Sequence, residues 1–316
     1  MATCNQCGER LPEGKNVCPE CGAVNTSEGV TDISEKTAAR EPDRRPDLKG
    51  ENEENVTDTA RMRVKPEGSP EVIRIKVKRQ DSTDGPSRWE EFDVPYRKGI
   101  NVLTCLMDIQ KNPVTAHGKK TTPVVWDSNC LEEVCGACSM VINGRVRQGC
   151  TALVDKLETP ITVAPMTKFP VVRDLMVDRS RIFEAFQKVH AWIDIDGTYD
   201  LGPGPKVAPE VQAARYDLSR CMACCCCMEA CPQYGPVSQF IGPAALNQVR
   251  LFNEHPTGKL NKDVRLNAMM QPGGVTDCGN AQNCVKVCPK EIPLTDSIAY
   301  LYRETTWYGL LGWLKK

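Results

Sequence analysis

The second half of this chain is organised around the cysteine-rich segment CMACCCCMEACP at residues 221–232. Its spacing C-x2-C-x2-C-x3-C-P is carried by four cysteines, namely Cys221, Cys224, Cys227 and Cys231. In this spacing three thiolates bind one iron–sulfur cluster, and the fourth cysteine, which precedes the proline, binds a second cluster. The sequence must therefore contain a second run of cysteines that completes both clusters.

The second run lies near the C-terminal end of the sequence and is one cysteine short. It contains Cys278, Cys284 and Cys288, and Pro289 again follows the last cysteine. The regular spacing would place a cysteine at position 281, but the residue there is Ala281. One complete ligand set predicts a [4Fe–4S] cluster: Cys221, Cys224, Cys227 and Cys288. The other set lacks a thiolate for a fourth iron and predicts a [3Fe–4S] cluster: Cys231, Cys278 and Cys284.

Three further cysteines fit neither of these frames. Cys225 and Cys226 lie inside the first run, and Cys105 lies on a predicted helix. A free cysteine behaves as a small hydrophobic residue, so we expect all three to be buried packing residues. For Cys225 and Cys226, an alternative register of cluster ligands is the competing interpretation.

A separate cysteine pattern in the middle of the chain predicts a third cluster. The spacing C-x4-C-x2-C-x11-C is formed by Cys130, Cys135, Cys138 and Cys150. Its first three cysteines match the plant-type [2Fe–2S] spacing. The small residues Gly136 and Ala137 would let backbone N–H groups approach the sulfur atoms. A zinc site is the less favoured alternative, because zinc sites prefer paired C-x2-C knuckles.

The sequence around this loop predicts a small α+β module. Apolar residues alternate with charged or polar residues over 72–78 and over 92–96, which indicates two half-buried strands. Asn101 can cap a helix that places Val102, Leu106 and Ile109 on one face. Asn143-Gly144 predicts a type I′ turn between strands at 139–142 and 145–148.

Beyond about residue 165 the apolar period becomes helical. We expect an amphipathic helix over 182–193, a Gly/Pro stretch over 197–205, and helical segments at 244–252, 264–270 and 294–304. The folded part of the chain is therefore predicted to be α+β. It comprises a β-grasp, plant-type ferredoxin-like domain over 69–165 and an all-α helical ferredoxin domain over 166–316.

The N-terminal extension has a cysteine pattern of its own. Residues 1–24 contain two C-x2-C-G knuckles, formed by Cys4, Cys7, Cys18 and Cys21. Such a pair holds one tetrahedral metal, and so short a segment cannot fold without it. We expect a zinc ribbon, and an iron site like that of rubredoxins is the alternative. Residues 25–68 are rich in charged residues, Thr and Pro, and we expect a flexible, disordered linker.

Composition excludes several other classes of protein. The chain has 316 residues, a net charge of −1 and 18 cysteines. The sequence has no signal-peptide pattern, so we expect reduced, metal-binding cysteines in a cytosolic compartment rather than a disulfide scaffold. A near-neutral charge disfavours a nucleic-acid partner. No apolar run approaches the roughly 20 residues of a membrane span, so we expect any membrane contact to be made through partners.

The chain resembles the iron–sulfur subunit of succinate dehydrogenase and fumarate reductase over about residues 70–305. The resemblance rests on the cysteine frames and on three further groups of residues: Asn129 to Met140, Phe169 to Leu175, and Asp178-Arg179. The branch from Gram-positive bacteria that use menaquinone is most like three other stretches: Tyr199 to Pro205, Asp277 to Asn280, and Cys288 to Leu294.

The resemblance implies an electron-transfer role between two partners. One is a flavoprotein subunit with covalent FAD, where succinate is oxidised, and the other is a membrane anchor, often with haem b, where quinone is reduced. Electrons would pass from FAD through [2Fe–2S], [4Fe–4S] and [3Fe–4S] to quinone, expected to be menaquinone. The chain would lie at the cytoplasmic face of the bacterial membrane, held there by its partners. The alternatives are a quinol:fumarate reductase and an electron-transfer subunit of another oxidoreductase.

Two departures from the family pattern concern the quinone. Many ubiquinone-type members have a His after the cysteine that corresponds to Cys278, and here the residue is Gly279. Many also have a Trp shortly after the cysteine that corresponds to Cys231, where this chain has Pro232 to Pro236. Tyr234 is a candidate substitute for a quinone contact, although a structural role is the favoured interpretation.

Overall fold

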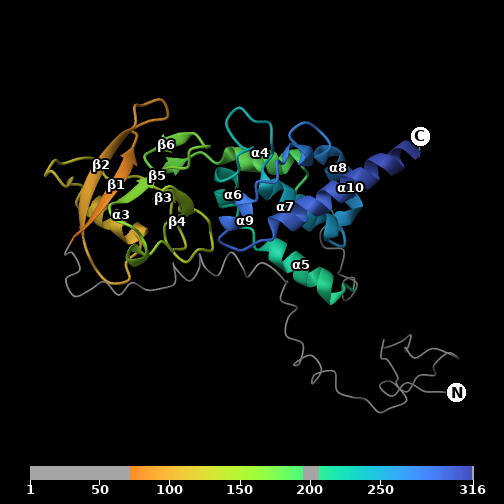
Figure 1. Ribbon diagram of the computed structural model, residues 1–316, viewed down its shortest axis with the longest axis horizontal. Helices are drawn as coiled ribbons and strands as arrows, with labels where there is room; N and C mark the ends of the chain where they lie inside the picture. Colours follow the sequence, from red (N-terminus) through yellow and green to blue (C-terminus); the bar gives the residue numbers. More distant parts are fainter. Residues whose placement is uncertain (1–71, 195–205, 315–316) are drawn as a thin grey trace, which may run out of the picture. The chain divides into compact units, whose positions relative to one another are not determined.

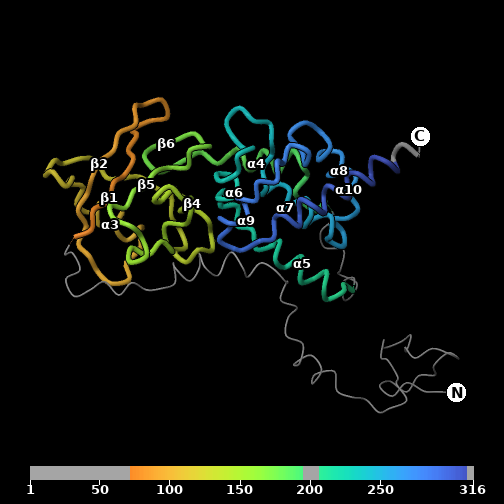
Figure 2. Tube along the Cα trace, viewed as in Figure 1, coloured from red at the N-terminus to blue at the C-terminus, as the bar shows by residue number. Residues whose placement is uncertain are grey.

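The computed structural model describes residues 72–194 and 206–314 (Figure 1). The predicted metal knuckles at Cys4, Cys7, Cys18 and Cys21 lie outside these residues, as do the predicted linker over 25–68 and the Gly/Pro stretch over 197–205. Figure 2 follows the described chain from the orange and yellow-green sheet region into the teal and blue helical region.

The alternating apolar residues build a five-stranded mixed sheet. The strands are β1 (Val72–Arg79), β2 (Arg88–Pro95), β3 (Ser139–Ile142), β4 (Arg145–Gln148) and β5 (Ile161–Ala164). Their order is β2-β1-β5-β3-β4, in which β1 and β5 are parallel and the other neighbours are antiparallel. The predicted strands and the hairpin around Asn143-Gly144 are confirmed, and β5 joins the two predicted strand pairs into one sheet.

Helix α3 (Val102–Lys111) covers the core of the sheet domain. Asn101 caps it as predicted, because its side chain accepts the N–H of Thr104 at 2.8 Å. The predicted face is buried, and Leu103 and Cys105 are buried with it. A short 3₁₀ turn, η1 (Val154–Lys156), precedes β5.

A second, two-stranded sheet corrects the prediction that everything after residue 165 is helical. Its strands are β6 (Val171–Arg173) and β7 (Met176–Val177), and Asp174 in their turn has a φ of 49°. The Asp174 carboxylate accepts hydrogen bonds from the Arg79 guanidinium, the closer at 2.8 Å, and both side chains are fully buried. Removing one partner of a buried ion pair costs about 3–5 kcal/mol, so this contact fastens the hairpin to β1.

The remaining elements are helical and surround α7. The α-helices are α4 (Ser180–Lys188), α5 (Pro209–Ser219), α6 (Cys226–Glu229), α7 (Pro243–Glu254), α8 (Lys262–Met269), α9 (Asn283–Lys286) and α10 (Leu294–Leu314), and the 3₁₀ turns are η2 (Gly258–Asn261) and η3 (Val275–Asp277). The three helical segments predicted after residue 243 are confirmed, and α10 continues ten residues beyond its predicted end. Within the described residues, no helix is both long and apolar enough to span a membrane.

Helix α4 ends five residues earlier than its apolar stripe predicts. Ile193 lies beyond the helix, because His190 adopts a φ of 52° and turns the chain. The fully buried Arg265 donates to the carbonyl oxygens of His190 and Trp192 at 2.9 and 2.8 Å. A tertiary hydrogen-bond partner that is distant in sequence therefore stabilises this non-helical segment.

Candidate iron–sulfur cluster sites

The loop from Cys130 to Cys138 surrounds a sulfur atom with backbone donors. Cys130 Sγ accepts the N–H groups of Glu132, Val134 and Cys135 at 3.4, 3.3 and 3.3 Å. Leu131 and Glu133 have left-handed φ values of 62° and 57°, which curl the loop around the sulfur. These donors, that of Glu132 most of all, lower the pKa of Cys130 to about 7. The loop is therefore shaped to hold a thiolate.

The other three cysteines of this set gather around the same loop. The Ala137 N–H donates to Cys135 Sγ at 3.4 Å, as the small residue at that position predicted. Burial raises the pKa of Cys150 to about 12, and a hydrogen bond between the Cys150 and Cys138 side chains adds to the shift. Among the described residues, no three His, Cys, Asp or Glu side chains converge closely enough to hold a single metal ion. A cluster distributes its thiolates over several irons instead.

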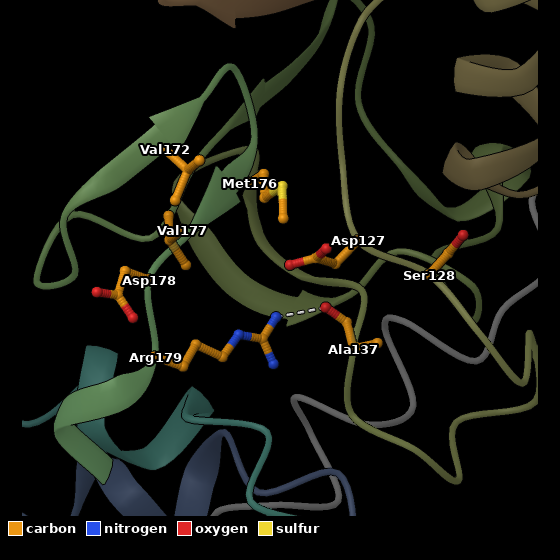
Figure 3. A pocket seen from close by; sticks show the side chains of 8 residues that line it. All are labelled: Asp127, Ser128, Ala137, Val172, Met176, Val177, Asp178 and Arg179. Carbon is orange, nitrogen blue, oxygen red and sulfur yellow. Dashed lines mark hydrogen bonds between the residues drawn. The ribbon is translucent and has the colours of Figure 1, made fainter. Parts of the chain in front are cut away.

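Gly136 has a second role that the sequence did not reveal. It has a φ of 73°, and a Cβ at this position would lie 2.7 Å from the Cβ of Cys224 in the helical domain. Ser139 Oγ donates to the Cys224 carbonyl at 2.6 Å, and Arg179 donates to the carbonyls of Gly136 and Ala137. Figure 3 shows Arg179 and Ala137 beside a pocket that β7 also lines. Glycine at 136 therefore permits close contact between two cysteine loops.

The two cysteine runs of the helical domain follow the same backbone course. Each position of the first run has its counterpart 57 residues later, so that Cys221 corresponds to Cys278 and Cys224 to Ala281. In both runs the second and fourth residues after the first cysteine are left-handed: Ala223 and Cys225 (50° and 67°), then Asn280 and Gln282 (52° and 59°). A four-residue helix follows in each case, α6 and then α9. Ala281 therefore occupies the backbone position of a ligand.

Two cavities collect the two predicted ligand sets. The first is lined by Cys221, Cys224, Cys227 and Cys288, together with Cys225 and apolar residues that include Ile292 and Leu294. The second is lined by Cys231, Cys278, Cys284 and Ala281, together with Pro243 and Ile298. In both cavities the cysteine before the proline comes from the other run. This arrangement matches the exchange of ligands that the spacing predicts.

Several thiols in these cavities resist ionisation because the surrounding protein desolvates them. Burial raises the pKa of Cys221 and Cys288, raises that of Cys284 to about 11, and raises that of Cys227 well above its ordinary value. Buried charge is unfavourable unless it is compensated, so a thiolate in either cavity requires a positive partner. A cluster iron would be such a partner and would displace the proton.

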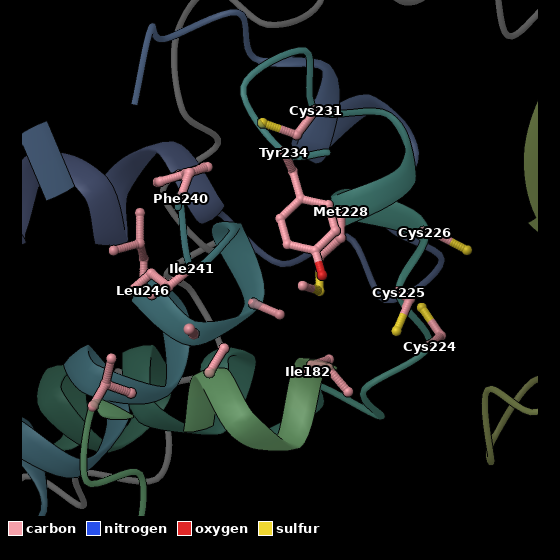
Figure 4. Packing of buried hydrophobic residues seen from close by; sticks show 14 of the residues in the cluster. Ile182, Cys224, Cys225, Cys226, Met228, Cys231, Tyr234, Phe240, Ile241 and Leu246 are labelled. Atoms are coloured by element: carbon pink, nitrogen blue, oxygen red, sulfur yellow. The ribbon is translucent and has the colours of Figure 1, made fainter. Parts of the chain in front are cut away.

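The predicted packing roles of Cys225, Cys226 and Cys105 agree with their burial. All three are at most 1% exposed, and Figure 4 shows the Cys226 sulfur pointing away from Tyr234 and the helical core. Tyr234 is 2% exposed, lies 5.8 Å from the Phe169 ring between centroids, and is covered by the Arg181 guanidinium. This burial favours the structural interpretation of Tyr234.

Sequence reasoning missed the polar residues between the cysteine loops. Gln148, Ser139 and Arg179 lie at the contact of the sheet and helical domains, where the first two are buried. Position 148 falls on the inward face of the predicted hairpin. A glutamine on an inward face needs a buried hydrogen-bond partner, and this was the signal in the sequence that could have identified it. One of its partners, Cys226, comes from a segment nearly eighty residues away.

These features define a ferredoxin-type iron–sulfur protein, with one site in a sheet domain and two in a helical domain. Two family models match: a 2Fe-2S iron-sulfur cluster binding domain over residues 74–184 and a 4Fe-4S dicluster domain over residues 217–292. The chain is 60% identical over 234 residues to the succinate dehydrogenase iron-sulfur subunit of Bacillus subtilis, covering 74% of this chain and 92% of that one. The chain therefore belongs to the family of succinate dehydrogenase iron–sulfur subunits.

Two further comparisons give a more distant relative and a solved structure with the same fold. The fumarate reductase iron-sulfur subunit of Wolinella succinogenes is 34% identical over 238 residues, which cover 74% of this chain and 97% of that one. A chain of the Mycobacterium smegmatis Sdh1 complex in the apo form has the same fold, with a TM-score of 0.62 at 24% identity. That likeness covers 75% of this chain and 96% of the other.

Proposed function

We propose that this chain is the electron-transfer subunit of a succinate:quinone oxidoreductase. It binds a flavoprotein subunit that carries FAD and a membrane anchor that carries haem b, at the cytoplasmic face of the bacterial membrane. The proposal rests on the two cavities of the helical domain. Each cavity is lined by cysteines from both runs, and the second also contains Ala281 at a ligand position. The 60% identity to a succinate dehydrogenase subunit favours this direction over fumarate reduction.

The residues that meet in the structure support the ligand sets that the cysteine spacing predicts. Cys130, Cys135, Cys138 and Cys150 would hold [2Fe–2S]. Cys221, Cys224, Cys227 and Cys288 would hold [4Fe–4S], and Cys231, Cys278 and Cys284 would hold [3Fe–4S]. When bound, the clusters supply one-electron carriers in that order between FAD and quinone, which we take to be menaquinone. The protein holds the thiolates, donates N–H groups to them and excludes water.

Two exposed apolar surfaces fit the two partners. Leu131 and Val134 lie on the [2Fe–2S] loop, and Val134 is 60% exposed. Exposed apolar side chains beside a buried redox site suit a surface that a partner covers, here the flavoprotein. Trp307, Leu310 and Leu311 are at least half exposed near the end of α10, and we assign this surface to the membrane anchor.

The second run supports an external electron acceptor beside the [3Fe–4S] site. Every residue from 279 to 283 is exposed, whereas none from 221 to 231 is. An exposed ligand loop lets an acceptor such as a quinone approach the last cluster closely. The N-terminal knuckles at Cys4, Cys7, Cys18 and Cys21 would bind zinc, and we assign them no part in electron transfer.

The test uses the complex purified from membranes with the full chain. We expect about nine non-haem irons and about one zinc per chain, with a flavin-containing subunit and succinate-dependent quinone reduction. A matched chain that lacks residues 1–68 should keep all three cluster signals and its turnover while losing the zinc. Absence of a three-iron signal from oxidised, anaerobically prepared complex would contradict the roles of Cys231, Cys278 and Cys284. About ten irons without zinc would contradict the zinc ribbon.

A further inference from the structure

A chain of buried polar side chains joins the [2Fe–2S] loop to the first cysteine run. At its centre is the Gln148 amide, which is 1% exposed at the end of β4. Its Nε2 donates to Ser139 Oγ at 2.7 Å and to Cys226 Sγ at 3.4 Å. On its other side, the Cys138 thiol donates to the amide Oε1 at 3.4 Å. Ser139 Oγ donates onward to the Cys224 carbonyl at 2.6 Å.

The contact with Cys138 must change when Cys138 binds iron. A thiolate ligand has no proton and can only accept a hydrogen bond. An amide oxygen at 3.4 Å would then place two acceptors against each other in a buried site, which is unfavourable. The oxygen and nitrogen of an amide occupy nearly equivalent positions. A half-turn of the Gln148 amide therefore brings an N–H group to the sulfur without displacing any neighbour.

The reversed amide finds partners for its oxygen among the same neighbours. Its oxygen then faces the Ser139 hydroxyl and the Cys226 thiol, and both of these groups can donate. Ser139 has a single proton, so when its hydroxyl turns to the amide oxygen, the Cys224 carbonyl loses its hydrogen bond of 2.6 Å. Cys226 lies in neither ligand set, so its thiol is available as a donor. The reversed amide oxygen therefore has two donors, and the cost of this orientation is the hydrogen bond to the Cys224 carbonyl.

We propose that Gln148 donates a hydrogen bond to the cluster ligand Cys138, with Cys226 and Ser139 as the positioning residues that orient its amide. This inference rests on the proposed role of Cys138 as a [2Fe–2S] ligand. One-electron reduction adds negative charge to the cluster and its thiolates. A donor to a cluster thiolate stabilises the reduced form and raises the reduction potential. Cys226 thus acts on the sheet-domain cluster although it belongs to the cysteine run of the helical domain.

The first test replaces the donor with an apolar side chain of similar size, Gln148→Leu. The midpoint potential of each cluster is measured in the assembled complex by redox titration monitored with electron paramagnetic resonance. We expect the [2Fe–2S] equilibrium to shift at least threefold toward the oxidised form, which is a decrease of about 30 mV at 59 mV per tenfold. The [3Fe–4S] potential should stay unchanged.

The second test separates orientation of the amide from simple packing. Cys226→Ala removes the donor and should shift the [2Fe–2S] potential in the same direction, by less than Gln148→Leu does. Cys226→Ser keeps a donor and should stay at the parent value. Cys105→Ala is the matched control, because Cys105 is an equally buried cysteine in the other hydrophobic core, and it should cause no shift.

The outcomes separate this inference from the function on which it rests. A Gln148→Leu complex with intact cluster signals and an unchanged [2Fe–2S] potential would overturn it. Equal shifts in Cys226→Ala and Cys226→Ser would do the same, and this pair decides the matter if Gln148→Leu does not assemble. A parent complex without any [2Fe–2S] signal would instead contradict the proposed ligand set.

Discussion

The cysteine runs that begin at Cys221 and at Cys278 share a backbone course, but their surroundings differ. The first run is enclosed, because Gly136 lies against Cys224 and Ser139 donates to the Cys224 carbonyl. The second run forms an exposed loop from residue 279 to residue 283. Its Gly279 lies near the flexible amide of Gln233 rather than near another backbone.

This difference separates two tasks that one repeated backbone can perform. An enclosed run suits exchange of electrons with another cluster of the same chain, since its surroundings are fixed by packing. An exposed run suits exchange with an external acceptor. The run without a cysteine at this position is the exposed one, in which Ala281 is the counterpart of Cys224. Three experiments test this difference between the two runs.

The largest effect is expected when the missing thiol is restored by Ala281→Cys. Because the backbone at 281 matches that at 224, the new thiolate should reach a fourth iron. We expect the three-iron signal of the oxidised complex to disappear and a second [4Fe–4S] signal to appear. The potential of that centre should fall and electron delivery to quinone should slow. Electron paramagnetic resonance and quinone-reduction rates measure both effects.

Two variants control this experiment. Ala281→Ser adds a side chain of similar size without a thiolate and should leave the three-iron signal in place. Cys224→Ala makes the first run like the second and should abolish the original [4Fe–4S] signal, while its Cβ preserves the contact with Gly136. If the three-iron signal persists in Ala281→Cys, a cysteine at position 281 does not act as a ligand in the way proposed for Cys224, although the two backbones match.

A smaller effect is expected from adding one methyl group to either run. Gly136→Ala places a Cβ 2.7 Å from that of Cys224, at a left-handed φ, and should cost about 2–4 kcal/mol. Gly279→Ala meets only the end of the Gln233 side chain and should cost less than about 1 kcal/mol. The urea midpoint for loss of cluster absorbance measures both. Equal losses would contradict the contrast between an enclosed and an exposed run.

The smallest effect concerns the left-handed residues that start α6 and α9. Glycine adopts this conformation without strain, so Gln282→Gly should stabilise the exposed run by about 0.5–1 kcal/mol. Cys225→Gly relieves the same strain but removes a buried side chain, and we expect no net gain. The same urea midpoint compares the two variants. A clear gain in Cys225→Gly would mean that the first run is less tightly packed than its burial indicates.

The sequence predicted most of what depends on local pattern. Ligand sets could be written from spacing alone, because cluster geometry imposes fixed intervals on the cysteines. The helix cap at Asn101 and the turn at Asn143-Gly144 could also be predicted, because caps and turns depend only on residues that are close in sequence. The residues missed were those whose partners are remote in sequence. Asp174 forms a turn anchored by Arg79 across nearly a hundred residues, and Arg265 stabilises the chain beyond α4 from a similar distance.

The role of Gly136 shows the same limit within the site itself. Its small size was readable from the sequence and was assigned to the sulfur atoms beside it. Only the folded chain places Cys224 against it. Local pattern therefore predicts candidate cluster ligands, while the contacts between cluster loops depend on how two separate patterns pack together.

The exchange of ligands between the two runs has a consequence for the time course of biosynthesis. On the proposed ligation, the [4Fe–4S] site gains its fourth thiolate only when Cys288 is made, 61 residues after Cys227. At about 5–20 residues per second, the first three thiolates wait about 3–12 s. The [2Fe–2S] site is complete by Cys150 and can be filled first. Between the synthesis of Cys227 and that of Cys288, the first three thiols of the [4Fe–4S] site can be oxidised or can bind another metal. A cell that makes this chain must therefore protect it until synthesis is complete.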